Sequence, residues 1–108
     1  MTGTPSQIEW AVLIKPRVHA EFERVVLAFA QVAGRQAEPD RRETQTIIEI
    51  VRQKQDETLA RDEAGYFIRD WQELRDQVRQ MIARDPRFEE IRVSREKRKR
   101  DREKGGDQ

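Results

Sequence analysis

Large apolar residues are confined to the first 91 positions of this 108-residue chain, and this distribution limits where a core can form. Residues 1–91 contain 23 of the 24 Leu, Ile, Val and Phe residues, whereas residues 92–108 contain only Val93. A segment without apolar side chains cannot bury enough surface to offset the entropy lost on folding. We therefore predict one helical domain over residues 1–91 and a separate basic tail over residues 92–108.

Within the first 91 residues the apolar positions recur at three- and four-residue steps, which is the period of an α-helix with one buried face. The clearest stripe consists of Phe67, Trp71, Leu74, Val78, Met81 and Ile82. The sequence predicts an all-α fold, a small bundle of three to four helices with a charged C-terminal tail that is helical or disordered. The predicted helices cover about 5–33, 41–60, 62–84, and 86–91 onward.

Several residues mark where these helices begin and end. The segment Thr4-Pro5-Ser6-Gln7 has the composition of a capping box with proline at the first helical position. Gly34 is suited to the end of the first helix, and Asp85 before a proline is suited to the start of the last. Pro16 interrupts the first stripe, which predicts either one kinked helix or a short helix followed by a longer one.

The chain contains little that could perform catalysis. It has no cysteine and one histidine, His19, which could place two metal ligands on one helix face together with Glu23 but has no third ligand. No glycine-rich loop, Glu-x-x-His motif or pair of carboxylates in a motif is present. We therefore expect no enzyme, no cofactor and no metal, and we interpret His19 as a polar residue beside the core.

Four aromatic residues lie in or beside the stripes. They could form a stacking platform for nucleic-acid bases, but helical spacing favours packing in the core. These residues are Trp10, Tyr66, Phe67 and Trp71. The sequence lacks a long apolar run and the basic and apolar regions of a signal peptide, so we expect no membrane association and a cytoplasmic location.

Charge divides the chain near Ile91 as well. Residues 1–91 carry 14 basic and 17 acidic side chains, a formal charge of −3, whereas residues 92–108 carry 8 and 4, a formal charge of +4. This density allows salt-sensitive contact with nucleic acid or with an acidic protein surface, although a solvated tail that aids solubility is the simpler alternative. The candidate contact residues are Arg92, Arg95, Lys97, Arg98, Lys99, Arg100, Arg102 and Lys104.

Two segments resemble a group of small uncharacterised bacterial proteins. The segment Thr4–Ala11, followed by Ile14, is similar to their opening helix, in which Ser or Thr precedes Gln-Ile, a charged residue and Trp-Ala. The segment Ala64–Asp70 is similar to their aromatic-rich block. The resemblance covers roughly 20 residues and implies a helical fold in which Trp10 contacts the third helix. It implies no activity.

Wide apolar faces are difficult to cover in so small a chain, so we predict a homodimer. The apolar stripe of residues 41–60 thins after Val51, which predicts a helix that projects into water or faces a second subunit. The candidate interface residues are Trp10, Leu13, Val26, Ile50 and Ile68. The predicted function is a non-catalytic helical interaction or oligomerisation module, including coiled-coil pairing; the alternative is a small nucleic-acid-associated protein that uses its basic tail.

Overall fold

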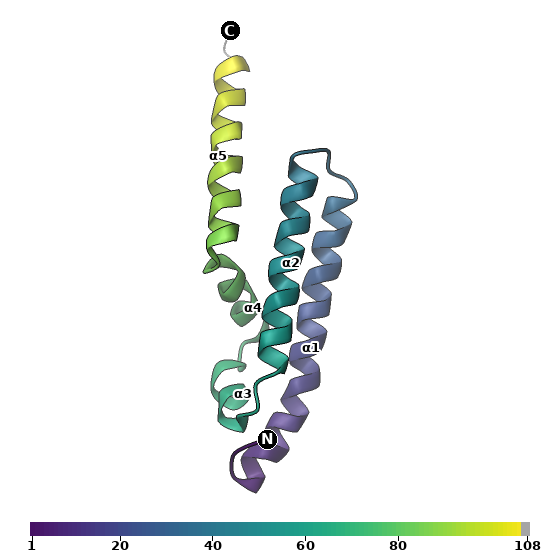
Figure 1. Cartoon of the computed structure of the whole chain (residues 1–108), viewed down its shortest axis with the longest axis vertical. Coiled ribbons are helices and arrows are strands. Elements are labelled where there is room, and N and C mark those ends of the chain that lie inside the picture. Colours follow the sequence, from purple (N-terminus) through teal and green to yellow (C-terminus); the bar gives the residue numbers. More distant parts are fainter. Residues whose placement is uncertain (107–108) are drawn as a thin grey trace.

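The computed structural model describes residues 1–106, which form five α-helices arranged as an elongated rod of 67 × 22 × 18 Å (Figure 1). The predicted all-α fold is confirmed, but the number of helices in the described residues is five rather than three to four. The helices are α1 (Pro5–Ala33), α2 (Asp40–Leu59), α3 (Ala64–Asp70), α4 (Leu74–Ala83) and α5 (Pro86–Gly106).

The first helix starts at the predicted capping box. The backbone N–H of Gln7 donates to Thr4 Oγ1 over 3.2 Å, and the Gln7 side chain accepts from the Thr4 N–H over 3.0 Å. The helix then runs through Pro16 as one element of 29 residues, so the alternative of two separate helices is wrong. Pro16 and Val12 are both exposed, so the carbonyl that loses its helical donor lies on the solvent side.

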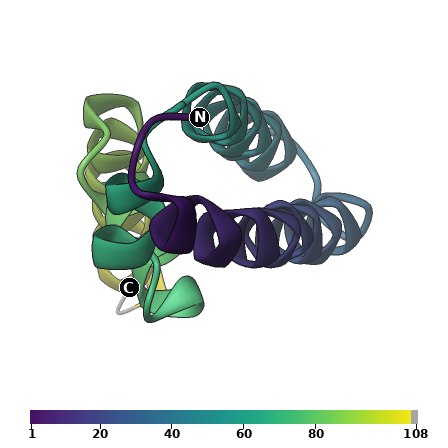
Figure 2. The ribbon, with the colours of Figure 1, turned by 90° about the horizontal axis from the view of Figure 1, so that it is seen from below.

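The helices α1 and α2 form an antiparallel hairpin, and α3, α4 and α5 lie to one side of it (Figure 2). Ile47 and Val51 of α2 are buried in the core. The stripe thins beyond Val51 because polar side chains of the same chain continue the buried face. Gln55 and Thr58 are 4% and 2% exposed, and Gln55 Nε2 donates to Glu23 Oε1 of α1 over 2.9 Å. The helix therefore neither projects into water nor needs a second subunit there.

The predicted helix over residues 62–84 is two helices, α3 and α4, separated at residues 71–73. The apolar stripe continues across the break, because Phe67, Trp71, Val78 and Ile82 are all buried. Because the chain changes direction at these residues, α3 and α4 both pack against α1, and α4 also contacts α2. Gln72 Nε2 donates to the Ile68 carbonyl over 3.3 Å, so a side chain partly replaces the lost helical hydrogen bonding.

The segment before α1 is fixed beside the start of α3. The Thr2 N–H donates to the Asp62 carbonyl over 2.7 Å, and the Ala64 N–H donates to the Thr2 carbonyl over 2.8 Å. Gly3 has a φ of +139°, and a Cβ added there would lie 3.0 Å from the Ala64 Cβ. Only glycine accommodates both this backbone conformation and this close approach.

Residues 92–106 continue α5, so this basic segment takes the helical one of the two forms predicted for it (Figure 1). The helix begins at Pro86, packs against α2 and α4, and reaches Gly106 without interruption. This continuity has a physical cause: the first half of α5 supplies Phe88 and Ile91 to the core, and the helix is extended from there. Residues 107–108 of the predicted tail lie outside the described residues.

Candidate functional site

His19 and Glu23 lie together on α1, but both belong to a polar network. His19 Nε2 is 3.8 Å from Glu23 Oε1, and the same oxygen accepts hydrogen bonds from Arg52 and Gln55 of α2. These hydrogen bonds, that of Arg52 above all, hold the pKa of Glu23 below its ordinary value. Within residues 1–106 no group of three or more His, Asp or Glu residues is placed to hold a metal ion.

The four aromatic residues considered as a stacking platform separate into three in the core and one outside it. Tyr66, Phe67 and Trp71 are buried, which confirms the interpretation of these three as core residues. The Trp71 ring packs at a tilt against Phe22 of α1, with 5.5 Å between ring centroids. Trp10 is 62% exposed, so its interpretation as a core residue is wrong. At 100° per residue, Trp10 lies about a quarter turn around α1 from the buried Ala11 and Val18.

The five candidate interface residues also separate. Val26 and Ile50 are 8% and 0% exposed, so the prediction that one chain leaves them open is wrong. Val26 belongs to the core cluster. Ile50 shares a face of α2 with Glu43 and Lys54. The Glu43 side chain pairs with Arg95 of α5, and the Lys54 side chain pairs with Asp85, the residue before α5. Ile68 is half-buried. Trp10 and Leu13 are well exposed.

Trp10 and Leu13 begin a longer exposed surface, with four apolar and three polar residues, that we name the outer face of α1. Its positions follow each other at alternating steps of three and four residues, and all of them are exposed. They are Trp10, Leu13, Arg17, Ala20, Arg24, Leu27 and Gln31. The sequence interpretation missed Ala20 and Leu27, although the regular 3–4 spacing from Trp10 could have identified them.

The eight basic candidates of residues 92–108 occupy different environments. Arg92 pairs with Glu89 one turn earlier on α5. Arg95 and Arg98 instead reach the start of α2 and form what we name the α2–α5 cluster with Asp40 and Glu43. Arg95 Nε lies 3.1 Å from Glu43 Oε1, and Arg98 donates to Asp40 Oδ1 over 2.8 Å. The cluster fastens α5 to α2.

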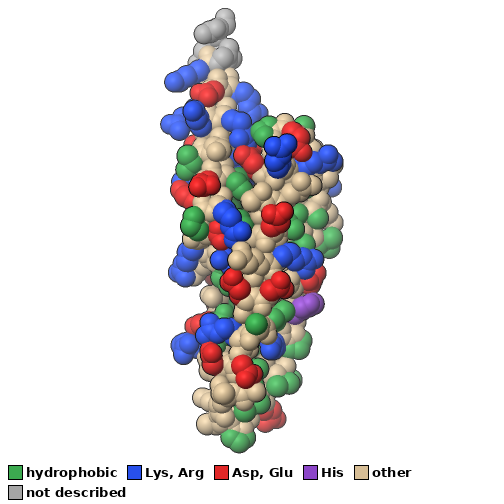
Figure 3. Space-filling view, in the orientation of Figure 1, with side chains coloured by type: hydrophobic (Ala, Val, Ile, Leu, Met, Phe, Trp, Pro, Cys, Tyr) green, Lys and Arg blue, Asp and Glu red, His purple; other side chains and the backbone are tan. Residues whose placement is uncertain are grey.

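The other five cations form what we name the basic end, and within residues 1–106 none of them takes part in an ion pair. They are Lys97, Lys99, Arg100, Arg102 and Lys104. Lys99 and Arg102 line an open hollow of about 400 Å³ together with Gln36, Asp40, Arg95 and Arg98. Figure 3 shows Lys and Arg side chains gathered around the upper part of α5.

The α2–α5 cluster predicts an acid-sensitive contribution to stability. Hydrogen bonds from Arg98 and Arg95 hold the pKa of Glu43 below its ordinary 4.5, against the opposing effect of burial. A lowered folded-state pKa stabilises the fold above about pH 4.5, and this contribution is lost as the pH falls through the folded-state pKa. We expect Glu43→Gln to cost about 1–2 kcal/mol at pH 7 and less at pH 3.

Urea unfolding of Glu43→Gln and of the parent chain at both pH values measures this difference. The exposed Glu57, which joins no ion pair within residues 1–106, supplies the control. Glu57→Gln should leave the free energy of unfolding within about 0.5 kcal/mol at either pH. A cost for Glu43→Gln that is the same at pH 7 and pH 3 would show that ionisation of Glu43 does not stabilise the contact.

Comparison with known proteins identified no relative of this chain. No protein-family model matches the sequence, and neither the curated proteins nor the solved structures include one that is significantly similar. The resemblance of Thr4–Ala11 and Ala64–Asp70 to small bacterial proteins therefore stays a prediction. Among the described residues, no helix combines the length and the apolar character that crossing a membrane requires.

Proposed function

We propose that the protein is a non-catalytic helical module that associates with a second copy of itself through the outer face of α1. The observation that carries this proposal is the exposure of three large apolar side chains on one helix face. Trp10 is 62%, Leu13 64% and Leu27 60% exposed. Exposed apolar side chains that align along one helix are typical of a surface that another helix covers.

The spacing of the face supports pairing of two helices. Steps of three and four residues are those of the a and d positions of a coiled coil, so side chains at these positions keep facing one partner. The face extends over residues 10–31, about 32 Å of helix at 1.5 Å per residue. Its apolar side chains lie towards its two ends, and the small Ala20 lies near its middle.

This arrangement is complementary to itself when two copies pair in antiparallel orientation. The Trp10 and Leu13 end of one copy then lies against the Leu27 end of the other, and the two Ala20 residues meet near the two-fold axis. In this arrangement Arg17 of one copy lies opposite Arg24 of the other, and the pairing of Arg24 with Glu21, with Nε 2.7 Å from Glu21 Oε1, partly neutralises the charge there. A second copy of this chain is therefore the proposed partner.

Light scattering coupled to size exclusion tests the proposal on the full chain. We expect a mass of about twice 12.9 kDa at tens of micromolar. Leu13→Glu places a carboxylate in the apolar contact, where it would be desolvated without a partner, so this variant should be a monomer. The matched control is Val93→Glu, which adds the same charge at an exposed apolar residue of α5.

Circular dichroism should give the same helical content for both variants, since both residues are exposed. A parent chain that is monomeric at every concentration would contradict the proposal. Dissociation by Val93→Glu but not by Leu13→Glu would also contradict it, because the contact would then lie on α5.

A further inference from the structure

We infer that the basic end of α5 binds the phosphate backbone of nucleic acid, without preference for sequence. This goes beyond self-association and does not depend on it, because the basic end and the outer face of α1 share no residue. The inference rests on the position of the basic end in the fold, on its unpaired charges, and on the absence of apolar residues from it.

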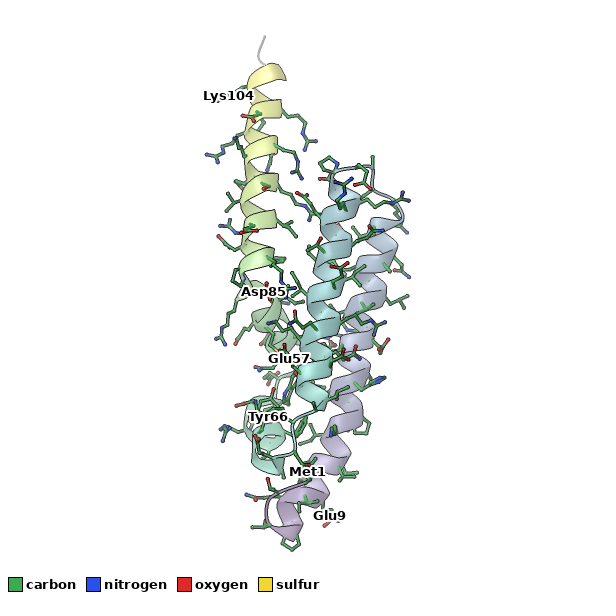
Figure 4. The ribbon with its side chains drawn as sticks, viewed as in Figure 1. Met1, Glu9, Glu57, Tyr66, Asp85 and Lys104 are labelled. Atoms are coloured by element: carbon green, nitrogen blue, oxygen red, sulfur yellow. The ribbon has the colours of Figure 1, made fainter. Side chains whose placement is uncertain are left out.

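The basic end projects beyond the rest of the molecule. Arg98 of α5 binds Asp40, the first residue of α2. The residues of α5 after Arg98 therefore extend past the N-terminal end of α2. The eight residues from Lys99 to Gly106 correspond to about 12 Å of helix. Figure 4 shows Lys104 near the upper end of α5, above the connection between α1 and α2. A long ligand can therefore approach this part of the helix from several sides.

The α2–α5 cluster leaves the charges of the basic end available. Arg95 and Arg98 are engaged by Asp40 and Glu43, and they hold the helix in place. Residues 97–104 still contain five other cations against only two carboxylates, Asp101 and Glu103. The structure thus separates two cations that position α5 from five that can bind a ligand.

The five cations cover two sides of the helix. Lys97, Arg100 and Lys104 are spaced three and four residues apart and share the side away from α2. Lys99 and Arg102 line the hollow beside Asp40. A phosphate that enters the hollow meets the Lys99 ammonium and the Arg102 guanidinium, while the outer three cations can contact neighbouring phosphates.

Nucleic acid fits this surface better than an acidic protein. Protein partners are held mainly by apolar and aromatic side chains in buried contacts, and α5 has no apolar residue after Val93. Phosphate backbones need only cations, because release of condensed counterions from the nucleic acid provides the affinity. Binding through Lys and Arg alone carries no information about base sequence.

Fluorescence anisotropy with labelled 20-base-pair DNA duplexes of two unrelated sequences and with single-stranded RNA tests the inference on the full chain. Five phosphate contacts on duplex DNA give a slope of about −4.5 in log affinity against log salt, a loss of about 500-fold between 50 and 200 mM salt. The triple variant Lys97→Gln/Arg100→Gln/Lys104→Gln should bind more weakly at 50 mM and lose only about 12-fold over this range, because two contacts remain.

The matched control is the triple variant Arg69→Gln/Arg79→Gln/Arg84→Gln, which removes the same amount of charge elsewhere. All three residues are exposed: Arg69 lies in α3, Arg79 lies in α4, and Arg84 directly follows α4. Its affinity and salt slope should equal those of the parent chain. Equal losses in both triple variants would show that only net charge matters and would overturn the inference. Binding to polyglutamate without binding to DNA or RNA would overturn it in favour of an acidic protein partner.

Discussion

Phe67→Ala is expected to destabilise the protein by about 3–5 kcal/mol, because it removes the largest side chain that α3 buries completely. Phe67 is 0% exposed, its ring centroid lies 5.2 Å from that of Tyr66, and Lys15 of α1 lies over its face. The short helix α3 cannot fill the resulting cavity without moving away from α1. A small domain has a total stability of roughly 5–15 kcal/mol, so this loss brings the chain close to unfolding.

Urea unfolding followed by far-UV circular dichroism measures this change. Trp71→Ala should give a loss in the same range, since Trp71 is 3% exposed and packs on Phe22. Glu57→Ala on the exposed side of α2 is the control and should change the free energy of unfolding by less than about 0.5 kcal/mol. A Phe67→Ala variant as stable as the control would show that α3 does not belong to the cooperative core.

The core was predictable from the sequence, whereas the path of the chain around it was not. Helical spacing identified Phe67, Val78 and Ile82 as buried, because periodicity reports which side chains face inward. The same spacing predicted a single helix, because residues 71–73 contain neither proline nor glycine. The break comes from tertiary packing, which aims α4 towards both α1 and α2, and no local signal in these residues indicates it.

The candidate surfaces show the same limit. Composition located the cations after residue 91, but it could not separate Arg95 and Arg98 from the rest, because their partners Asp40 and Glu43 lie more than 50 residues away in the chain. Helical spacing predicts a core position for Trp10. Its position on the outer face of α1 depends on which side α2 and α3 cover, and only the fold determines this.

Asp85→Ala is expected to cost about 3 kcal/mol, because Asp85 caps α5 and links the start of this helix to α2. Asp85 lies at the junction of α4 and α5, beside α2 (Figure 4), and is 5% exposed. Its Oδ1 accepts the backbone N–H of Arg87 over 2.9 Å, and its Oδ2 lies 3.3 Å from Lys54 Nζ of α2. The loss combines the cap, about 0.5–2 kcal/mol, with charge-assisted hydrogen bonds, about 1.5–3 kcal/mol.

Asp85→Asn separates these two contributions, because Asn retains a cap acceptor but carries no charge, so we expect about half the cost of Asp85→Ala. The hydrogen bonds from Arg87 hold the pKa of Asp85 well below its ordinary 3.8, against burial, and Lys54 lowers it further. The stability difference between parent and Asp85→Asn should therefore be constant above about pH 4 and shrink only at lower pH. Urea unfolding across this range, with Asp76→Asn on the exposed side of α4 as control, measures it. Equal costs for Asp85→Asn and Asp85→Ala would show that the charge, and not the cap, fixes the start of α5.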